Sequence, residues 1–279
     1  MSSSRQSLGP VGRFLGALGA INLNALGLLA RRGPAAAAVY ATYTHRLYKG
    51  FGLPWVWSDL PWRQDMRVPR VAPQVLFPQV DFTRSPDLLY PQPRDLSVHP
   101  HELMILCSVL QWLQPVRTVE FGTAEGRTTL NFALHAPENG EVVTVNLPPE
   151  HENTAVGFFY WDSPLKAKIK QVLSDVGGWD SAPYRESAGL VFCDACDQQP
   201  GMAQEMAQAF AVVKHGGVIF RHDYGSAEGP TRFWNEVSNE LPVRHIEGTT
   251  LLCLKVETPE LLQKMRSVAA RILKEVTNE

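Results

Sequence analysis

Short β-branched runs alternate with longer helical segments from residue 97 onward, and this alternation constrains the fold more than any other feature of the chain. The runs predicted as strands are 116–121, 141–145, 169–173, 190–193, 217–220, 243–246 and 250–255. The predicted helices are 127–136, 164–171, 201–213, 229–240 and 259–276. Strands that alternate with helices are typical of a parallel sheet with helices on both faces. We therefore expect an α/β fold with a doubly wound, mostly parallel seven-stranded sheet, to which the last two strands add an antiparallel edge.

Residues 1–95 differ in character and are predicted as a basic, aromatic-rich N-terminal extension, helical and irregular, ahead of a main domain at 96–279. Residues 1–70 carry nine basic and two acidic side chains, a formal charge of +7. The rest of the chain therefore carries −9, because the total is −2. Apolar residues recur at helical spacing across 14–29, and an Ala-rich stretch with three tyrosines covers 35–48. Such a charge split predicts that the two parts meet different surroundings.

Three interpretations of the extension compete. The favoured one is a cap that covers a binding cleft on the main domain. The second is an amphipathic segment, residues 11–32, that makes peripheral contact with an anionic membrane surface. The third is a cleaved organellar presequence, since the first 58 residues contain no acidic side chain. Four cysteines are too few for a disulfide framework, so a cytoplasmic location is expected, with membrane association as the alternative. The near-neutral charge gives no support for a nucleic-acid partner, and a homo-oligomer is left open.

The most informative motif begins where the strand at 116–121 ends. Glu120 is followed by a turn with glycines at Gly122 and Gly126, and a helix then opens near Thr128. Glycines allow the backbone to approach a ligand closely, and the first turn of a helix offers N–H groups to an anion such as a carboxylate. The spacing differs from the G-x-G-x-x-G of dinucleotide-binding proteins. Taken alone, a purely structural turn explains this motif nearly as well.

Together with four later segments, this motif resembles motif I of the class I S-adenosylmethionine-dependent methyltransferases. The segments resemble those of a bacterial branch whose strands end in Asp-Gly-x-His and His-Asp-Tyr. They are VNLPP at 145–149, FCDACD at 192–197, GGVIFRHDY at 216–224 and IEGTT at 246–250. The resemblance covers residues 97–255 and implies a Rossmann-like methyltransferase fold with S-adenosyl-L-methionine as cofactor.

The resemblance also implies roles for individual residues. The implied cofactor-binding residues are Glu120, Gly122, Thr123, Gly126, Thr128, Asn146, Asp175 and Asp194. Asn146 replaces the acid that in this family holds the ribose hydroxyls, and an amide has only one acceptor oxygen. A hydrogen bond worth roughly 0.5–1.5 kcal/mol is therefore expected to be lost there.

Two polar clusters follow neighbouring predicted strands, and they carry the chemical prediction. The expected catalytic residues are His222 and Asp223. Related O-methyltransferases hold Mg²⁺ with acids from these strand ends, which here implies Asp194, Asp223 and Asp197 as ligands. His222 then serves either as a ligand to a softer divalent metal or as the general base. A structural role for His222 and Asp223, in which they bind loop backbone, is weighed equally with metal ligation.

The predicted function is therefore methyl transfer to an oxygen of a small-molecule, sugar or lipid-linked acceptor. The alternative is a non-catalytic binding module on the same fold, suggested by Asn146 and by Ala195, which replaces the family's glycine. A nicotinamide-dependent oxidoreductase is disfavoured by the glycine spacing. Cys193 and Cys196 form a C-x-x-C without a partner motif, so coincidence is preferred over zinc or redox chemistry. Residues 36–95 and the aromatic loop 156–163 are the candidate lids over the cleft.

Overall fold

The computed structural model describes residues 65–91, 98–151 and 155–277. The chain divides into two compact units, Met1–Asp65 and Met66–Glu279. The predicted helix at 14–29, the Ala-rich stretch at 35–48 and the membrane-contact segment 11–32 lie outside the described residues. The cap and membrane interpretations of that segment therefore stay predictions. Among the described helices, each is too short or too polar to cross a membrane.

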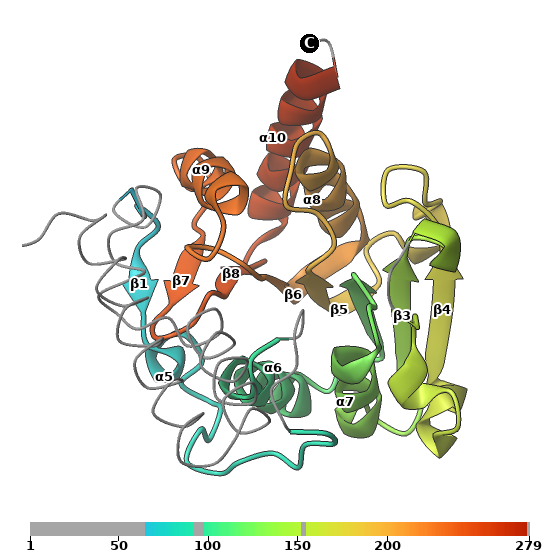
Figure 1. Cartoon of the computed structure of the whole chain (residues 1–279). Helices are drawn as coiled ribbons and strands as arrows, with labels where there is room; N and C mark the ends of the chain where they lie inside the picture. The colour runs from blue at the N-terminus through green and yellow to red at the C-terminus, as the bar shows by residue number, and fades with distance from the viewer. Residues whose placement is uncertain (1–64, 92–97, 152–154, 278–279) are drawn as a thin grey trace, which may run out of the picture. The chain divides into compact units, whose positions relative to one another are not determined.

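The second unit is built on one eight-stranded sheet with the order β1-β7-β8-β6-β5-β2-β3-β4 (Figure 1). Its strands are β1 (Arg70–Val71), β2 (Arg117–Phe121), β3 (Glu141–Asn146), β4 (Ile169–Leu173), β5 (Ala188–Cys193), β6 (Val213–Arg221), β7 (Arg244–Ile246) and β8 (Leu252–Lys255). All neighbours pair in parallel except β8, which is antiparallel to both β6 and β7. The predicted α/β class, mostly parallel sheet and antiparallel end are confirmed.

Helices pack on both faces of this sheet. They are α5 (Pro73–Leu76), α6 (Pro100–Leu113), α7 (Arg127–His135), α8 (Gly201–Val212), α9 (Glu228–Val237) and α10 (Pro259–Thr277). Short 3₁₀ turns are η1 (Pro149–His151), η2 (Phe158–Tyr160), η3 (Pro164–Lys168) and η4 (Ala182–Tyr184). The predicted helix at 164–171 is therefore wrong. Only the single turn η3 forms there, capped by Ser163, because its chain passes directly into β4.

The core consists of two apolar layers, one on each face of the sheet. Val119 and Phe121 of β2 belong to the layer that includes residues of α8, α9 and α10. Phe192 of β5 and Phe220 of β6 belong to the other layer, which includes residues of α6 and α7. Successive side chains of a strand point to opposite faces, so one strand supplies both layers. Figure 1 shows the same division, with α8, α9 and α10 on one side of the sheet and α5, α6 and α7 on the other.

The sheet has one strand more than predicted because residues 66–71 join it. The hydroxyl of Tyr224 accepts hydrogen bonds from the backbone N–H groups of Arg67 and Val68, each at 3.0 Å, and donates to Asn235 at 2.7 Å. β1 then pairs in parallel with β7. Residues 66–71 thus belong to the same compact unit as the sheet, Met66–Glu279. A two-residue strand has too few residues to show a hydrophobic period, so the sequence pattern did not reveal it.

Candidate functional site

Three adjacent strands end level with one another at the carboxyl edge of the sheet. The last residues of β2, β5 and β6 are paired in register, namely Phe121, Cys193 and Arg221. The pairing continues one residue further, since the N–H of Asp194 donates to Phe121 O (2.9 Å) and the N–H of His222 donates to Cys193 O (3.1 Å). The chain runs from β2 outward to β3 and β4 and returns as β5 on the other side of β2. Such a reversal of strand order is where open α/β sheets bind ligands.

Four charged side chains meet at this edge and form what we call the carboxylate–histidine cluster: Glu102, Asp194, His222 and Asp223. His222 Nδ1 lies 2.9 Å from Asp194 Oδ1 and 3.5 Å from Asp223 Oδ2, and its Nε2 lies 3.2 Å from Glu102 Oε2. Asp223 has a φ of +65°, which aspartate tolerates better than most residues, and its Oδ1 accepts from Ser226 Oγ at 2.5 Å. Both ring nitrogens of His222 therefore face carboxylates.

The charges in this cluster shift one another's pKa values. Burial by itself would lower the pKa of His222, but Asp194 and Asp223 raise it well above its ordinary value. Burial by itself would raise the pKa of Glu102, but His222 and Thr250 lower it to about 2. Burial raises the pKa of Asp194, although His222 opposes this effect. These surroundings favour a protonated imidazole, which argues against the predicted role of His222 as a neutral general base.

The cluster contains a donor set that suits a divalent metal. Oxygen atoms of Asp194 and Asp223 and a ring nitrogen of His222 lie within 4.8 Å of one another. Asp197, the third predicted ligand, is elsewhere: its side chain is largely exposed, and its Oδ1 accepts from Arg221 at 2.8 Å. Two carboxylates and an imidazole suit Mn²⁺ or a similar transition metal better than Mg²⁺, which prefers oxygen ligands. The structure thus brings His222, which was predicted as a ligand to a softer metal, and not Asp197, next to Asp194 and Asp223, and metal binding itself stays a prediction.

Behind the cluster, the buried side chain of Arg221 binds the loop that follows β5. It is 1% exposed, and its guanidinium donates to the carbonyls of Cys193 (3.0 Å) and Cys196 (2.6 Å) as well as to Asp197. Glu205 of α8 lies 3.8 Å from it and accepts from the N–H of Ala195 at 2.8 Å. Arg221 and Glu205 thus hold the loop that follows β5 from its two sides.

The same arrangement accounts for the C-x-x-C motif. The carbonyls of both cysteines bind Arg221, while the two thiols are free and burial raises their pKa values. A thiol with a raised pKa is a poor nucleophile and a poor metal ligand. The structure therefore agrees with coincidence as the reason for the spacing.

The turn after β2 requires both of its glycines, each with a positive φ. At Gly122 (φ +93°) a Cβ would lie 2.5 Å from the carbonyl oxygen of Asp194, so this glycine lets the ends of β2 and β5 approach. At Gly126 (φ +81°) a Cβ would lie 2.4 Å from the ring of Tyr160. Gly126 therefore makes room for the aromatic loop and also begins α7.

Asn146, at the end of β3, forms hydrogen bonds with the backbone of this turn. Its side-chain oxygen accepts from the N–H groups of Thr123 (2.9 Å) and Ala124 (3.2 Å), and its amide nitrogen donates to Leu147 O at 2.9 Å. The expected loss of a hydrogen bond to the ribose stays a prediction, but the structure shows how the acceptor is used. The single oxygen of Asn146 already binds two backbone groups of the turn.

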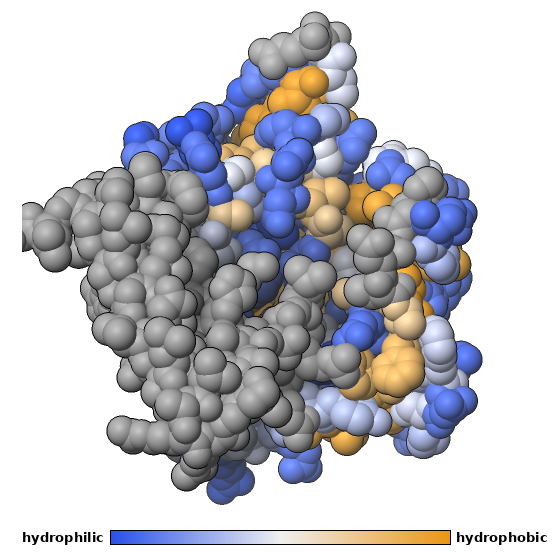
Figure 2. Space-filling view, viewed as in Figure 1, coloured by the Kyte–Doolittle hydropathy of each residue, from blue (hydrophilic) through white to orange (hydrophobic). Residues whose placement is uncertain are grey.

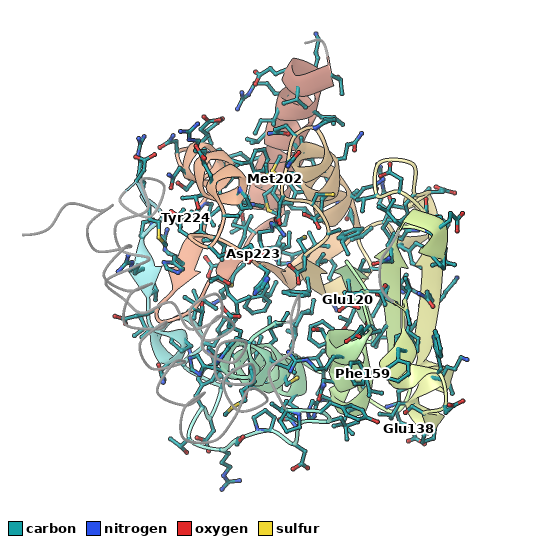
Figure 3. All side chains as sticks on the ribbon, viewed as in Figure 1. Glu120, Glu138, Phe159, Met202, Asp223 and Tyr224 are labelled. Carbon is teal, nitrogen blue, oxygen red and sulfur yellow. The ribbon has the colours of Figure 1, made fainter. Side chains whose placement is uncertain are left out.

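Glu120 lies beneath the turn, fully buried. Its Oε2 accepts from the hydroxyls of Thr144 (2.6 Å) and Thr129, whereas its Oε1 has no hydrogen-bond partner among the described residues. Thr123 is held in the same group, with its hydroxyl 2.6 Å from that of Thr144. Burial raises the pKa of Glu120 to about 8, although the two threonine bonds oppose this effect. In Figure 3, Glu120 and Asp223 lie between the helices of the two layers.

Two predicted cofactor residues lie at the margins of this edge. Thr128 is nearly buried in the first turn of α7. Asp175 lies in the exposed turn after β4, where its Oδ2 accepts from the N–H of Gly178 at 3.3 Å. The strand order places β4 two strands away from β2, so Asp175 is the member of the predicted set that the sheet separates most from the cluster.

The aromatic loop 156–163 is bonded to the glycine turn. The N–H of Gly157 donates to Ala124 O and that of Phe159 to Glu125 O, both at 2.9 Å. Tyr160 is buried against Gly126, and its hydroxyl has no partner among the described residues. Phe158 is 51% exposed and Trp161 is 47% exposed. Figure 2 shows hydrophobic surface on this side of the molecule. This loop is one of the two predicted lids, and most of the other, at residues 36–64 and 92–95, lies outside the described residues.

The sequence did not identify Glu102, Arg221 and Glu205 as parts of the site, whereas Tyr160 belongs to the aromatic loop predicted as a lid. Helix α6, which carries Glu102, was not predicted, although Pro100 at its first position and the apolar run that follows are helix signals. A reading of that helix would still not have placed Glu102 next to His222, which is 120 positions away. Contacts of this kind depend on the order of strands in the sheet.

Solved structures with a similar course of chain are methyltransferases of low sequence identity. The O-methyltransferase TomG from Streptomyces achromogenes, in complex with SAM, is 18% identical, with a TM-score of 0.46 over 59% of this chain and 83% of that one. An O-methyltransferase from Bacillus cereus, in complex with SAH, is 19% identical, with a TM-score of 0.48 over 59% and 84%. A methyltransferase from Geobacter sulfurreducens is 16% identical, with a TM-score of 0.47 over 58% and 81%. No curated protein matches the sequence.

A family model does match the sequence itself. The match runs from residue 119 in β2 to residue 224 after β6, and the model describes a methyltransferase domain. This range includes the glycine turn, Asn146, Asp194 and the His222–Asp223 pair, which carried the resemblance found in the sequence. Over the strands that form the site, the chain is thus similar to the methyltransferase-domain family, as its motifs predicted.

Proposed function

We propose that this protein is an S-adenosylmethionine-dependent methyltransferase that methylates an oxygen of a small-molecule, sugar or lipid-linked acceptor. The observation that carries the proposal is the meeting of two features at one sheet edge. The glycine turn after β2 and the carboxylate–histidine cluster after β5 and β6 end strands that are hydrogen-bonded in register. One feature suits the binding of a cofactor, and the other suits deprotonation of an acceptor.

The residues at the turn fit the methionine end of S-adenosylmethionine. Two buried polar atoms, Glu120 Oε1 and Tyr160 Oη, have no hydrogen-bond partner among the described residues. A buried polar atom without a partner is costly, so a ligand that bonds to it gains free energy. When bound, the cofactor supplies an electrophilic methyl group on a sulfonium centre. A cationic group near Glu120 would also favour its ionised form, which burial otherwise disfavours.

The chain itself contributes positioning and charge to the proposed reaction. The two reactants must lie in line, and holding them in that geometry lowers the barrier without any covalent step by the protein. Asp194 and Asp223 both present carboxylate oxygens to Nδ1 of His222. Asp194, whose pKa is raised by burial, suits the acceptance of the acceptor's proton, whereas His222 and Ser226 hold the pKa of Asp223 far below its ordinary value and make it a weak base. His222 carries a proton beside both carboxylates.

The same cluster fits a divalent transition metal held by Asp194, His222 and Asp223. A metal there would lower the pKa of an acceptor hydroxyl that binds to it. The proposal of methyl transfer does not depend on this metal, because Asp194 offers a proton acceptor without it. Metal dependence is therefore a separate question with its own experiment.

Calorimetric titration with S-adenosylhomocysteine tests the proposed function. We expect saturable binding to the full chain. We also expect weaker binding when Tyr160→Phe removes the unpartnered hydroxyl, with Tyr184→Phe as the matched control, because Tyr184 is buried against Trp179 away from the turn. No binding by the wild-type protein at high ligand concentration would reject the function.

Titration with Mn²⁺ tests the metal site. We expect Asp194→Ala and Asp223→Ala to abolish Mn²⁺ binding while binding of S-adenosylhomocysteine survives. Asp197→Ala is the matched control, since the side chain of Asp197 faces Arg221 and is expected to leave the Mn²⁺ affinity unchanged. Equal loss in all three variants would favour the ligand set predicted from the sequence over the set that the structure brings together.

A non-catalytic binding module is the second candidate, and two observations favour it. The oxygen of Asn146 is used by the turn, and the ring of Tyr160 lies against Gly126. Both features restrict the space and the acceptors that a cofactor would need. Transfer of a labelled methyl group from S-adenosylmethionine to a panel of hydroxylated acceptors separates the two candidates, because a binding module would bind S-adenosylhomocysteine without any turnover.

A further inference from the structure

Glu102 is a buried carboxylate that neither the motifs nor the family match contains. It is the third residue of α6, is 4% exposed, and lies outside the matched range of 119–224. Its Oε1 accepts from the N–H (2.6 Å) and the hydroxyl (2.9 Å) of Thr250. Its Oε2 accepts from the N–H of His99 (3.2 Å) and lies 3.2 Å from His222 Nε2. One carboxylate thus joins a helix start, the segment before β8 and the cluster.

Capping of α6 does not explain this arrangement. A capping box needs a single bond from the glutamate to the backbone N–H of the N-cap residue, and such glutamates normally lie in solvent. Here the carboxylate is removed from water and makes three further contacts, which a glutamine or an apolar residue could not reproduce as a set. A buried charge persists where partners of opposite charge or hydrogen-bond donors compensate its desolvation. His222 is the partner with a ring nitrogen directed at it.

The contact has a geometric consequence for His222. Two roughly equivalent ring orientations are open to a histidine, and they exchange the places of its nitrogens. With Nε2 bonded to Glu102, only Nδ1 is left to face Asp194 and Asp223. Carboxylates that hold the far nitrogen of a functional histidine commonly fix its orientation in this way.

We infer that Glu102 is a positioning residue that holds the ring of His222 with Nδ1 directed at Asp194 and Asp223. The inference rests on the proposed function, in that the cluster it orders is the proposed site of methyl transfer. Glu102 itself touches neither aspartate. Glu102 therefore acts on the proposed chemistry only through His222. Its other oxygen, Oε1, is held by the two hydrogen bonds from Thr250.

The test is the ring N–H of His222 in the full-length protein, observed by nuclear magnetic resonance after labelling with ¹⁵N-histidine. His222→Gln assigns the resonance by its disappearance. We expect a wild-type Nε2–H signal that exchanges with water much more slowly than that of His101, which is exposed on the same helix. In Glu102→Gln we expect this slow exchange to be lost. A wild-type signal that exchanges as fast as that of His101, or an unchanged signal in Glu102→Gln, would overturn the inference.

Thr250→Val is the matched control. It removes one hydrogen bond to Glu102 but leaves the contact with His222, so the slow exchange is expected to persist. A general loosening of the fold would instead remove the signal in both variants, which would count against a specific role for Glu102. Mn²⁺ affinity gives a second readout, for which we expect a loss of about 10–100-fold in Glu102→Gln.

Titration with S-adenosylhomocysteine separates this inference from the proposed function. Wild type and Glu102→Gln are expected to bind it with equal affinity, because Glu102 is not part of the glycine turn. Failure of the wild type to bind would reject the function and leave the resonance result standing. Binding by both proteins with an unchanged resonance would reject only the role of Glu102.

Discussion

The glycine turn after β2 and the carboxylate–histidine cluster after β5 and β6 lie at the same edge of the sheet, but different forces hold them. In the turn, backbone groups are bonded to Asn146 and to the aromatic loop, and the glycines adopt conformations that other residues resist. In the cluster, charged side chains from distant segments compensate one another, with Arg221 and Glu205 behind them. The turn depends on conformation, and the cluster depends on charge pairing.

This difference predicts how each region fails. Removal of one member of a buried ion pair leaves an uncompensated charge, and the cost then exceeds that of a single lost hydrogen bond. An altered turn instead suffers local strain or a steric clash, which the neighbouring loop can partly relieve. Substitutions behind the cluster should therefore act on the stability of the whole domain, and substitutions in the turn should act more on cofactor binding.

The largest effect is expected for Arg221→Met. This change leaves Glu205 buried without its cation and frees the carbonyls of Cys193 and Cys196. We expect a loss of about 3–5 kcal/mol in the free energy of unfolding, measured by urea denaturation. Arg271→Met, an exposed arginine of α10, is the control and should hardly move the midpoint. A small effect at Arg221 would mean that charge pairing does not hold this region.

Gly126→Ala tests the conformational side of the comparison. Strain from the positive φ alone should cost about 1–2 kcal/mol, and the clash with Tyr160 should add about 1–3 kcal/mol. Gly248→Ala provides the matched control, because Gly248 has a φ of +78° and open space around its Cβ position. The difference between the two variants in urea denaturation isolates the clash, and equal losses would show that the aromatic loop does not constrain Gly126.

Asn146→Ala should have an intermediate effect. It leaves the N–H groups of Thr123 and Ala124 without their acceptor, at an expected cost of about 1–3 kcal/mol in unfolding free energy. We also expect weaker binding of S-adenosylhomocysteine in the calorimeter, since the turn loses its support. Unchanged affinity together with lower stability would separate the role of Asn146 in folding from any role in binding.

The smallest effect, taken per pH unit, is the pH dependence of stability that is due to Glu120. Its pKa rises from 4.5 to about 8 on folding, so between these pH values the folded chain binds a proton that the unfolded chain has released. Stability therefore falls as pH rises across that window, by at most about 1.4 kcal/mol per pH unit from this group. Glu120→Gln removes the titration. The free energy of unfolding of this variant, measured relative to wild type by urea denaturation, should therefore rise from pH 5 to pH 8. A constant difference would contradict the assignment.

Much of the fold followed from local pattern, and the reason is physical. Strands β2, β3 and β5 and the second half of β6 are buried on both faces, so their sequences are rich in apolar and β-branched residues, a pattern that few other structures accommodate. Helix α6 and strand β1 escaped prediction for opposite reasons. Helix α6 begins at a proline that follows a proline-rich segment, which reads as irregular chain. Strand β1 is two residues long and exists only through its pairing with β7.

The sequence by itself determined where the site residues stand along the chain, because backbone preferences place glycines in turns and polar residues at strand ends. Only the tertiary structure decided which polar atoms remain open to a ligand. From the sequence alone, Asp194 and Asp197 are equally suitable as metal ligands. In the structure, Asp194 faces His222, whereas Asp197 binds Arg221. The physical reason is that a charge in a protein interior takes its partner from whatever the packing of distant strands and helices brings within reach. Glu102, 120 positions from His222, is the clearest case.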